Sequence, residues 1–289
     1  MKPRKDVYQI ITDRIIAQLE SGVVPWHRPW TETSMPRNLA SDRPYHGINA
    51  FLLTSTGYDS PHWLTWNQLK RLGGSVRSGE KACPIVFWKR YERETEERDA
   101  AGNPVVESRA FLRYFSVFNT TQCEGIDEHV PEPELPSHDF SPVGAAEAVV
   151  AGMPKCPTIE HGFRTACYSP LNDSVRMPRR ERFNGPEAYY ATLFHELTHS
   201  TGHASRLGRE GIAATAAFGS DRYSAEELIA EMGAAFICGH AGIETATIDN
   251  SAAYIHHWMQ RLRDDRRLIV RTAAQAQKAA DFVLGTARE

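Results

Sequence analysis

The sequence predicts an α+β fold, with an N-terminal α+β domain that contains a small antiparallel sheet and a mostly helical C-terminal domain with a short sheet. Two observations predict it. Apolar residues recur with a helical period near both ends of the chain, in residues 7–19 and 254–283. Two apolar runs, 84–90 and 110–118, flank a charged stretch in the N-terminal half, as the strands of a hairpin do.

A proline-rich segment separates the two halves. Prolines at positions 131, 133, 136 and 142 indicate a linker with little regular structure at residues 128–142. The 289 residues correspond to two domains at about 100–200 residues each. We therefore expect domains at residues 1–127 and 143–289.

The elements of the N-terminal domain follow from periodicity and stop signals. A helix over 7–19 ends at Gly22, and a turn-rich aromatic segment leads to a short helix over 50–55. A capped helix is predicted over 63–72, before two glycines. The strands 84–90 and 110–118 then enclose charged residues 91–104, which we expect to form an exposed hairpin loop.

The C-terminal domain is expected to begin with a helix over 143–151, followed by short strands around 158–163 and 167–177. Asn184-Gly185-Pro186 can begin a long helix over 187–201, and Gly202 can end it. The remaining predicted helices cover 224–238, 254–264 and 268–283.

Composition excludes several classes of protein. Apolar residues make up 41% and charged residues 24%, and no apolar run is long enough to cross a bilayer. The N-terminal stretch is basic and then amphipathic, without the apolar core of a signal peptide. Five scattered cysteines without a C-x-x-C pair fit reduced thiols better than a disulfide framework. We therefore expect a cytoplasmic protein.

The most specific motif is His195-Glu196-Leu197-Thr198-His199, within the helix predicted over 187–201. Residues four apart lie on one face of a helix, so both imidazoles can reach one metal ion. Glu196 can then contact a water on that ion as general base, which is the arrangement of H-E-x-x-H metallopeptidases. The alternative is a pair of ordinary core histidines.

A catalytic zinc ion needs a third protein ligand. His203 follows the predicted helix end, and Ser205 stands where the longer pattern H-E-x-x-H-x-x-G-x-x-H has its last histidine. The next predicted helix offers Glu226, Glu227 and Glu231 instead. Glu227 is predicted as the ligand, and Glu231, four residues later on the same face, as the acid that supports a ligand histidine. This is the thermolysin-like layout.

Other interpretations of this helix stay open. Ser224-x-x-Glu227 is also a capping box, in which Glu227 only satisfies its own helix terminus. Glu226 or Glu231 can take its place as ligand. The small residues Gly233, Ala234 and Ala235 can let this helix approach the motif helix closely.

A mechanism follows from this site. Zn²⁺ would lower the pKa of its water toward about 7, and Glu196 would pass the proton to a leaving amine. The strand over 168–175 is a candidate edge to which an extended peptide adds. Tyr189, Tyr190 and Tyr223 are candidates to stabilise an oxyanion, although packing explains each of them better.

Positive charge lies in the N-terminal half. Residues 1–125 have a balance of +3 and the rest −6, within a net charge of −3, which fits a polyanion surface and an ordinary solvated surface equally well. Aromatic faces among cations bind single strands without reading sequence. The candidate DNA-binding residues are Trp26, Arg28, Trp30, Tyr45, Trp63, Trp66, Lys70, Arg71, Arg77 and Lys81. Residue by residue, core packing of the Trp and Tyr side chains is the better interpretation.

Motifs across the chain resemble those of ArdC-type antirestriction proteins, from about residue 6 to 284. They include Tyr45-His46-Gly47-Ile48-Asn49, Trp63-Leu64-Thr65-Trp66-Asn67-Gln68, Gly79-Glu80-Lys81, His195–His203, Arg206-Leu207 and Glu226–Glu231. The resemblance implies an N-terminal single-stranded-DNA-binding domain, shared with certain plasmid primases, and a C-terminal zincin-like metallopeptidase domain. The implied role, on conjugative plasmids, is to protect incoming DNA from host restriction in the recipient cytoplasm.

We thus expect an antirestriction protein that binds single-stranded DNA and carries a gluzincin-type peptidase site, with a host protein as a candidate substrate and no membrane partner. Zinc is the expected cofactor, although two histidines and a glutamate also accept Mn²⁺ or another divalent ion. Two alternatives stay open. One is a general intracellular metallopeptidase with a protein-docking N-domain, and the other is a non-enzymatic DNA-binding protein with a structural metal.

Overall fold

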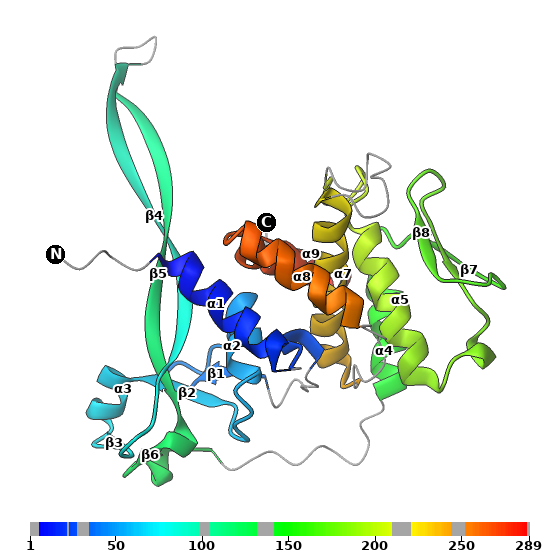
Figure 1. Cartoon of the computed structure of the whole chain (residues 1–289). Helices are drawn as coiled ribbons and strands as arrows, with labels where there is room; N and C mark the ends of the chain where they lie inside the picture. Colours follow the sequence, from blue (N-terminus) through cyan, green and yellow to red (C-terminus); the bar gives the residue numbers. More distant parts are fainter. Residues whose placement is uncertain are drawn as a thin grey trace.

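The computed structural model confirms the α+β fold. It describes residues 6–21, 23–27, 35–98, 104–131, 142–209, 221–243 and 252–287. An N-terminal sheet with a long hairpin lies at one end, the helices lie in the middle, and a second sheet lies at the other end (Figure 1). Residues 132–141 of the predicted linker fall outside the described residues, as do Arg28 and Trp30.

The N-terminal half alternates short helices with strands. Its elements are α1 (Val7–Glu20), η1 (Pro25–His27), β1 (Arg37–Asn38), α2 (Ile48–Thr54), β2 (His62–Thr65), α3 (Trp66–Arg71), β3 (Ser75–Val76), β4 (Cys83–Arg98), β5 (Pro104–Asn119), η3 (Thr120–Gln122), β6 (Cys123–Glu124) and η4 (Asp127–His129). The main sheet has the order β1-β2-β5-β4, with β1 parallel to β2 and the other pairs antiparallel. A separate antiparallel pair joins β3 to β6.

The hairpin of β4 and β5 is longer than the sequence predicts. Its register runs from Cys83 opposite Val117 to Arg98 opposite Pro104. The expected loop at 91–104 is therefore wrong for residues 91–98, which are strand. Charged residues conceal such a strand from a pattern search, because the search depends on alternating apolar and polar residues.

The predicted helix over 63–72 is also wrong at its start. Residues 63–65 belong to β2, where Trp63 pairs with Asn119 of β5. The Thr65 hydroxyl accepts from the backbone of Gln68, whose side chain accepts from the Thr65 backbone. This capping box starts α3 at Trp66, since the cap residue itself has extended backbone angles.

The C-terminal half is mostly helical, as expected. Its elements are α4 (Pro142–Gly152), β7 (Thr158–His161), β8 (Cys167–Ser169), β9 (Ser174–Met177), η5 (Arg180–Arg182), α5 (Pro186–Ser200), α7 (Asp221–Ala241), α8 (Ala252–Asp264) and α9 (Leu268–Val283). The strand expected around 167–177 is wrong, because a turn at Asp173, with φ of 47°, divides it into β8 and β9. The sheet order is β7-β9-β8, so β8 is an edge strand.

Both halves of the chain contribute to one hydrophobic core. Ile15 of α1 and Phe51 of α2 belong to the same buried cluster as the C-terminal helices. Phe51 stacks on Phe236 of α7 with ring centroids 4.5 Å apart, and Trp26 packs against Trp258 of α8 at 5.5 Å. The N-terminal helices are therefore fixed to the helix bundle, while the exact domain boundaries stay a prediction. Within the described residues, we find no helix with the length and apolar character needed to cross a membrane.

Candidate metal centre

Two packed helices bring the predicted metal ligands together. α5 carries His195 and His199, and α7 carries Glu227. The helices lie very close at Gly233, where an added Cβ would come within 2.5 Å of Cγ2 of Thr198. The close approach predicted from the small residues of α7 is confirmed at this glycine.

Three side-chain donors face one another between these helices. The Nε2 atoms of His195 and His199 are 3.1 Å apart, and carboxylate oxygens of Glu227 lie 3.6 Å and 3.5 Å from them. Tetrahedral metal bonds of about 2.0–2.1 Å place neighbouring ligand atoms about 3.4 Å apart. The donors therefore fit three corners of a tetrahedral ion. Within the described ranges, no other group of three His, Cys, Asp or Glu side chains is arranged to hold an ion.

A second carboxylate lies behind each histidine. Oε1 of Glu231 is 3.9 Å from Nδ1 of His195, and Oε1 of Glu226 is 3.5 Å from Nδ1 of His199. A carboxylate facing Nδ1 favours the tautomer that leaves the lone pair of Nε2 available to a metal. Glu226 and Glu231 thus face the outer sides of the imidazoles, while Glu227 faces the centre.

The capping-box alternative for Glu227 is wrong. α7 begins at Asp221, so Ser224 lies inside the helix and is not its N-cap residue. Glu227 does not have that role; its side chain is 20% exposed, and its carboxylate lies next to both histidines.

Arg209 holds Glu226 in place. Its guanidinium donates to the two carboxylate oxygens of Glu226 at 2.6 and 3.1 Å, and both side chains are buried. It also donates to the carbonyl of Thr198 and the hydroxyl of Thr201, at 2.9 and 2.6 Å. Arg209 therefore ties the last turn of α5 to α7. Sequence reasoning missed it, because its position depends on the path of the chain after α5.

Negative charge dominates the centre. Burial by itself would lower the pKa of His195, but a hydrogen bond to Glu227 and the charges of Glu231, Glu196 and Glu227 raise this pKa from 6.5 to about 9. The surrounding carboxylates thus hold a proton on the imidazole. The carboxylates favour a positive charge at this position. A metal cation between the histidines can supply that charge in place of the proton.

Glu196 lies next to both the donors and the edge strand. Its side chain is buried within α5, and its charge acts on His195. Burial, with the charge of Glu196, also raises the pKa of the Cys167 thiol in β8. β8 therefore packs against α5 near Glu196.

The turn after α5 fastens this edge strand. Arg206, almost fully buried, donates to both carboxylate oxygens of Asp173 at 2.8 and 2.9 Å. Tyr168 of β8 donates to the same carboxylate at 2.8 Å. His203 takes part in this turn through Ser205, whose hydroxyl is 2.8 Å from its Nδ1, and does not belong to the donor group.

The oxyanion candidates Tyr189 and Tyr190 are core residues. Both are buried, and their hydroxyls are hydrogen-bonded to His161 and Glu147. The packing interpretation is correct for these two tyrosines. The side chain of Tyr223 lies outside the described residues.

The predicted DNA-binding residues divide by burial. Trp26, Tyr45 and Trp63 are 0%, 6% and 1% exposed, so their rings lie in the core, as the packing interpretation expects, and a role for these residues in DNA binding stays a prediction. Trp66 is 46% exposed, with the ammonium of Lys70 lying 5.4 Å from its ring centroid. The other exposed members of the set are Arg71, Arg77 and Lys81.

Comparison with known proteins connects this arrangement to a family. The model for the N-terminal domain of anti-restriction factor ArdC matches residues 5–118, and a model for a zincin-like metallopeptidase matches residues 145–275. The metal-free crystal structure of the antirestriction ArdC protein from plasmid R388 has 38% sequence identity to this chain and a TM-score of 0.76, over 97% of each chain. The chain belongs to the ArdC antirestriction family.

Two further matches extend over almost the whole chain. The Mn(II)-bound R388 ArdC structure gives a TM-score of 0.73 at 36% identity, over 97% of this chain and 98% of that one. An uncharacterized protein, y4eC, of Sinorhizobium fredii is 33% identical, over 96% of this chain and 91% of its own length.

Two Escherichia coli proteins named DNA primase TraC are 35% and 33% identical over 97% and 98% of this ArdC-family chain. The chain spans only 27% and 20% of their lengths. The region that they share with this chain is therefore a minor part of each primase.

Proposed function

We propose that this chain protects incoming plasmid DNA from host restriction, by binding single-stranded DNA and by carrying a metal-dependent peptidase site. The peptidase part of this proposal rests on the arrangement of His195, His199 and Glu227, whose donor atoms face one another next to Glu196. The family model for an ArdC N-terminal domain supports the DNA-binding part. The site of action would be the cytoplasm of the recipient cell.

We propose His195, His199 and Glu227 as the ligands of one divalent ion. Zinc suits two imidazoles and one carboxylate in tetrahedral geometry. The same donors accept manganese, which is the ion in the similar R388 ArdC structure. A bound ion would supply Lewis-acid chemistry, acidifying water and polarising a peptide carbonyl.

The residues around the ion transfer the proton, orient the histidines and bind the substrate. Glu196 accepts a proton from the attacking water and returns it to the leaving amine. Glu226 and Glu231 face the Nδ1 atoms of the imidazoles at 3.5 and 3.9 Å, and their charges would orient the rings. The edge of β8 that carries no partner among the described strands pairs with an extended peptide and lays its carbonyl beside Glu196, and the substrate would be a host protein.

Replacement of Glu196 tests the peptidase part. Glu196→Gln keeps the shape of the side chain but cannot accept a proton at neutral pH. The zinc-loaded variant should retain one metal per chain and lose at least about 100-fold in cleavage of an unfolded protein substrate. If this variant cleaves the substrate as fast as the wild type, the proposed peptidase site is wrong.

The same variant separates proteolysis from protection. Conjugation of an unmodified plasmid into a restricting recipient should fall to the level without the protein when Glu196 is replaced, with a non-restricting recipient as the control. Full protection by Glu196→Gln would show that antirestriction does not need cleavage, even if the purified wild type cleaves protein.

A further inference from the structure

The root of the β4–β5 hairpin exposes aromatic side chains on one face. Residues directly opposite in an antiparallel pair share a face, so Phe87 and Arg113 lie on the same face as Ile85 and Phe115. Phe87 is 47% and Phe115 42% exposed, and their ring centroids are 5.8 Å apart. Adjacent exposed apolar side chains are a feature of binding surfaces.

The other face of the same strands packs in part against the rest of the protein. Val86 belongs to the main hydrophobic core and Leu112 packs against it. Trp88 packs on Tyr8 of α1 in an edge-to-face contact at 6.3 Å. The hairpin root is thus anchored from behind, which holds Phe87 and Phe115 in fixed positions.

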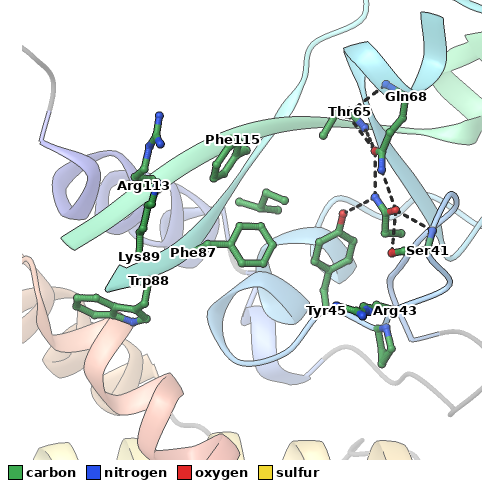
Figure 2. A pocket seen from close by; sticks show the side chains of 13 residues that line it. Ser41, Arg43, Tyr45, Thr65, Gln68, Phe87, Trp88, Lys89, Arg113 and Phe115 are labelled. Atoms are coloured by element: carbon green, nitrogen blue, oxygen red, sulfur yellow. Dashed lines mark hydrogen bonds between the residues drawn. The ribbon is translucent and has the colours of Figure 1, made fainter. Parts of the chain in front are cut away.

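The exposed rings form one wall of a groove of about 640 Å³. Figure 2 shows Phe87 and Phe115 side by side, with Tyr45 beyond them and the loop that carries Ser41 and Arg43 at the far end. The Nδ2 of Asn38 donates to the Tyr45 hydroxyl at 3.3 Å, and Asn38 also exchanges hydrogen bonds with Gln68. The groove therefore combines an apolar wall with a fixed polar end.

The charge of the groove is positive. Arg43, Lys89 and Arg113 line it, and no aspartate or glutamate is among the lining residues. The guanidinium of Arg113 lies 5.8 Å from the ring centroid of Phe115, so a cation and an aromatic surface are adjacent. In the part of the chain that the structure describes, none of these three cations forms an ion pair with a carboxylate.

We propose that this groove is the single-stranded-DNA site of the protein, an inference that rests on the proposed DNA-binding function. Bases stack on Phe87 and Phe115, and the phosphates between them contact Arg113, Lys89 and Arg43. The Tyr45 hydroxyl, which accepts from Asn38, keeps its own proton to donate to a base edge. Stacking accepts any base, so recognition is sequence-tolerant. A duplex keeps its base faces covered and cannot use these rings.

Binding of a fluorescent oligo-dT of about 12 nucleotides, within the site sizes of single-strand binders, tests the site in the full-length protein. The double variant Phe87→Ala/Phe115→Ala should weaken binding at least tenfold, at about 1.4 kcal/mol per factor of ten. Tyr114→Ala is the matched control, because Tyr114 is 50% exposed on the same strand but on the opposite face. Phe115→Leu, which keeps apolar bulk without a ring, should also weaken binding while leaving the melting temperature unchanged.

The cations are tested by salt dependence. Arg113→Gln should reduce the slope of log affinity against log salt by about 0.7 for one lost phosphate contact. Arg164→Gln makes the same charge change at an exposed position between β7 and β8 and should leave the slope unchanged.

The outcomes separate the two proposals. If the wild type binds no oligo-dT at about 50 mM salt, where phosphate contacts are strong, the DNA-binding function itself is wrong. If the wild type binds and the double phenylalanine variant, folded by circular dichroism, binds equally well, only the groove is wrong. If Tyr114→Ala weakens oligo-dT binding as much as the double phenylalanine variant does, the groove is also wrong, and the site lies elsewhere on the hairpin.

Discussion

Arg209 and Glu226 form a buried two-point ion pair directly behind His199. The guanidinium nitrogens lie 2.6 and 3.1 Å from the carboxylate oxygens, and Oε1 of Glu226 lies 3.5 Å from Nδ1 of His199. Burial by itself would raise the pKa of Glu226, but the hydrogen bonds and charges of His199 and Arg209 lower it. Glu226 is therefore a fixed anion, and the imidazole of His199 faces it.

Removal of Arg209 should damage both stability and metal binding. Arg209→Ala leaves the Glu226 carboxylate buried without its partner, which costs about 3–5 kcal/mol. The imidazole of His199 then loses a fixed support, and metal affinity should fall about 10- to 100-fold. Chemical denaturation of the metal-free protein and calorimetric metal titration measure the two effects separately.

The double variant Arg209→Met/Glu226→Gln is the control for this prediction. It removes both charges, so the metal-free protein should recover much of the lost stability, whereas metal affinity should stay low. Metal affinity at the wild-type level in Arg209→Ala would show that Glu226 does not position His199.

Gly233 should tolerate no side chain. A Cβ at this position would lie 2.5 Å from Cγ2 and 3.0 Å from Oγ1 of Thr198, and overpacking of this kind costs about 1–3 kcal/mol. Gly233→Ala should therefore lower the free energy of unfolding by that amount. Adding Thr198→Ser, which removes Cγ2 and keeps the hydroxyl that donates to Phe194, should recover part of the loss. Additive effects of the two substitutions would contradict the close contact.

The metal-free protein should lose stability as pH rises from about 6.5 to about 9. The pKa of His195 is raised to about 9 in the folded chain, so the folded state holds more protons than the unfolded state in this window. Stability then falls as pH rises, and the contribution is fully present only below about 6.5. Thermal melting of chelator-treated protein across this range, with His195→Gln as the reference, measures the effect.

Metal binding should reverse this dependence. An ion on Nε2 displaces the proton of His195, so in the same pH window binding should release about one proton per ion and tighten as pH rises. Calorimetry in buffers of different ionisation enthalpy counts the protons. Uptake of protons, or no exchange at all, would contradict the assigned charge state.

Arg206 should control the local stability of the edge strand. It holds Asp173 in the turn between β8 and β9, and it also donates to the carbonyl of Lys155 at 2.8 Å. Arg206→Ala should raise amide exchange in residues 167–177 about tenfold, equivalent to about 1.4 kcal/mol of local stability. Exchange in α9, which is remote along the chain, serves as the internal control and should change less.

Regular periodicity made most of the helices predictable. The apolar periods at both ends of the chain correspond to α1, α8 and α9, and Gly185-Pro186 marks the start of α5. The position of the Glu227 carboxylate beside His195 and His199 could also be inferred, because the four-residue spacing within each of two helices fixes which side chains share a face.

Features that depend on tertiary context could not be predicted. Trp26 and Trp63 are in the core, whereas Phe87 and Phe115 are exposed, and nothing in their local sequence distinguishes the two pairs. Arg209 reaches Glu226 only through the folded path after α5. In each case the environment is set by elements far away in the sequence, which residue type and spacing do not report.

The proposed metal centre can be tested with a crystal structure of the protein containing zinc or manganese, measured at the metal absorption edge. We expect one anomalous peak about 2.0–2.2 Å from Nε2 of His195, Nε2 of His199 and a carboxylate oxygen of Glu227, with the fourth position facing Glu196. A peak bound through Glu226, Glu231 or His203 in place of Glu227, or no peak between α5 and α7, would contradict it.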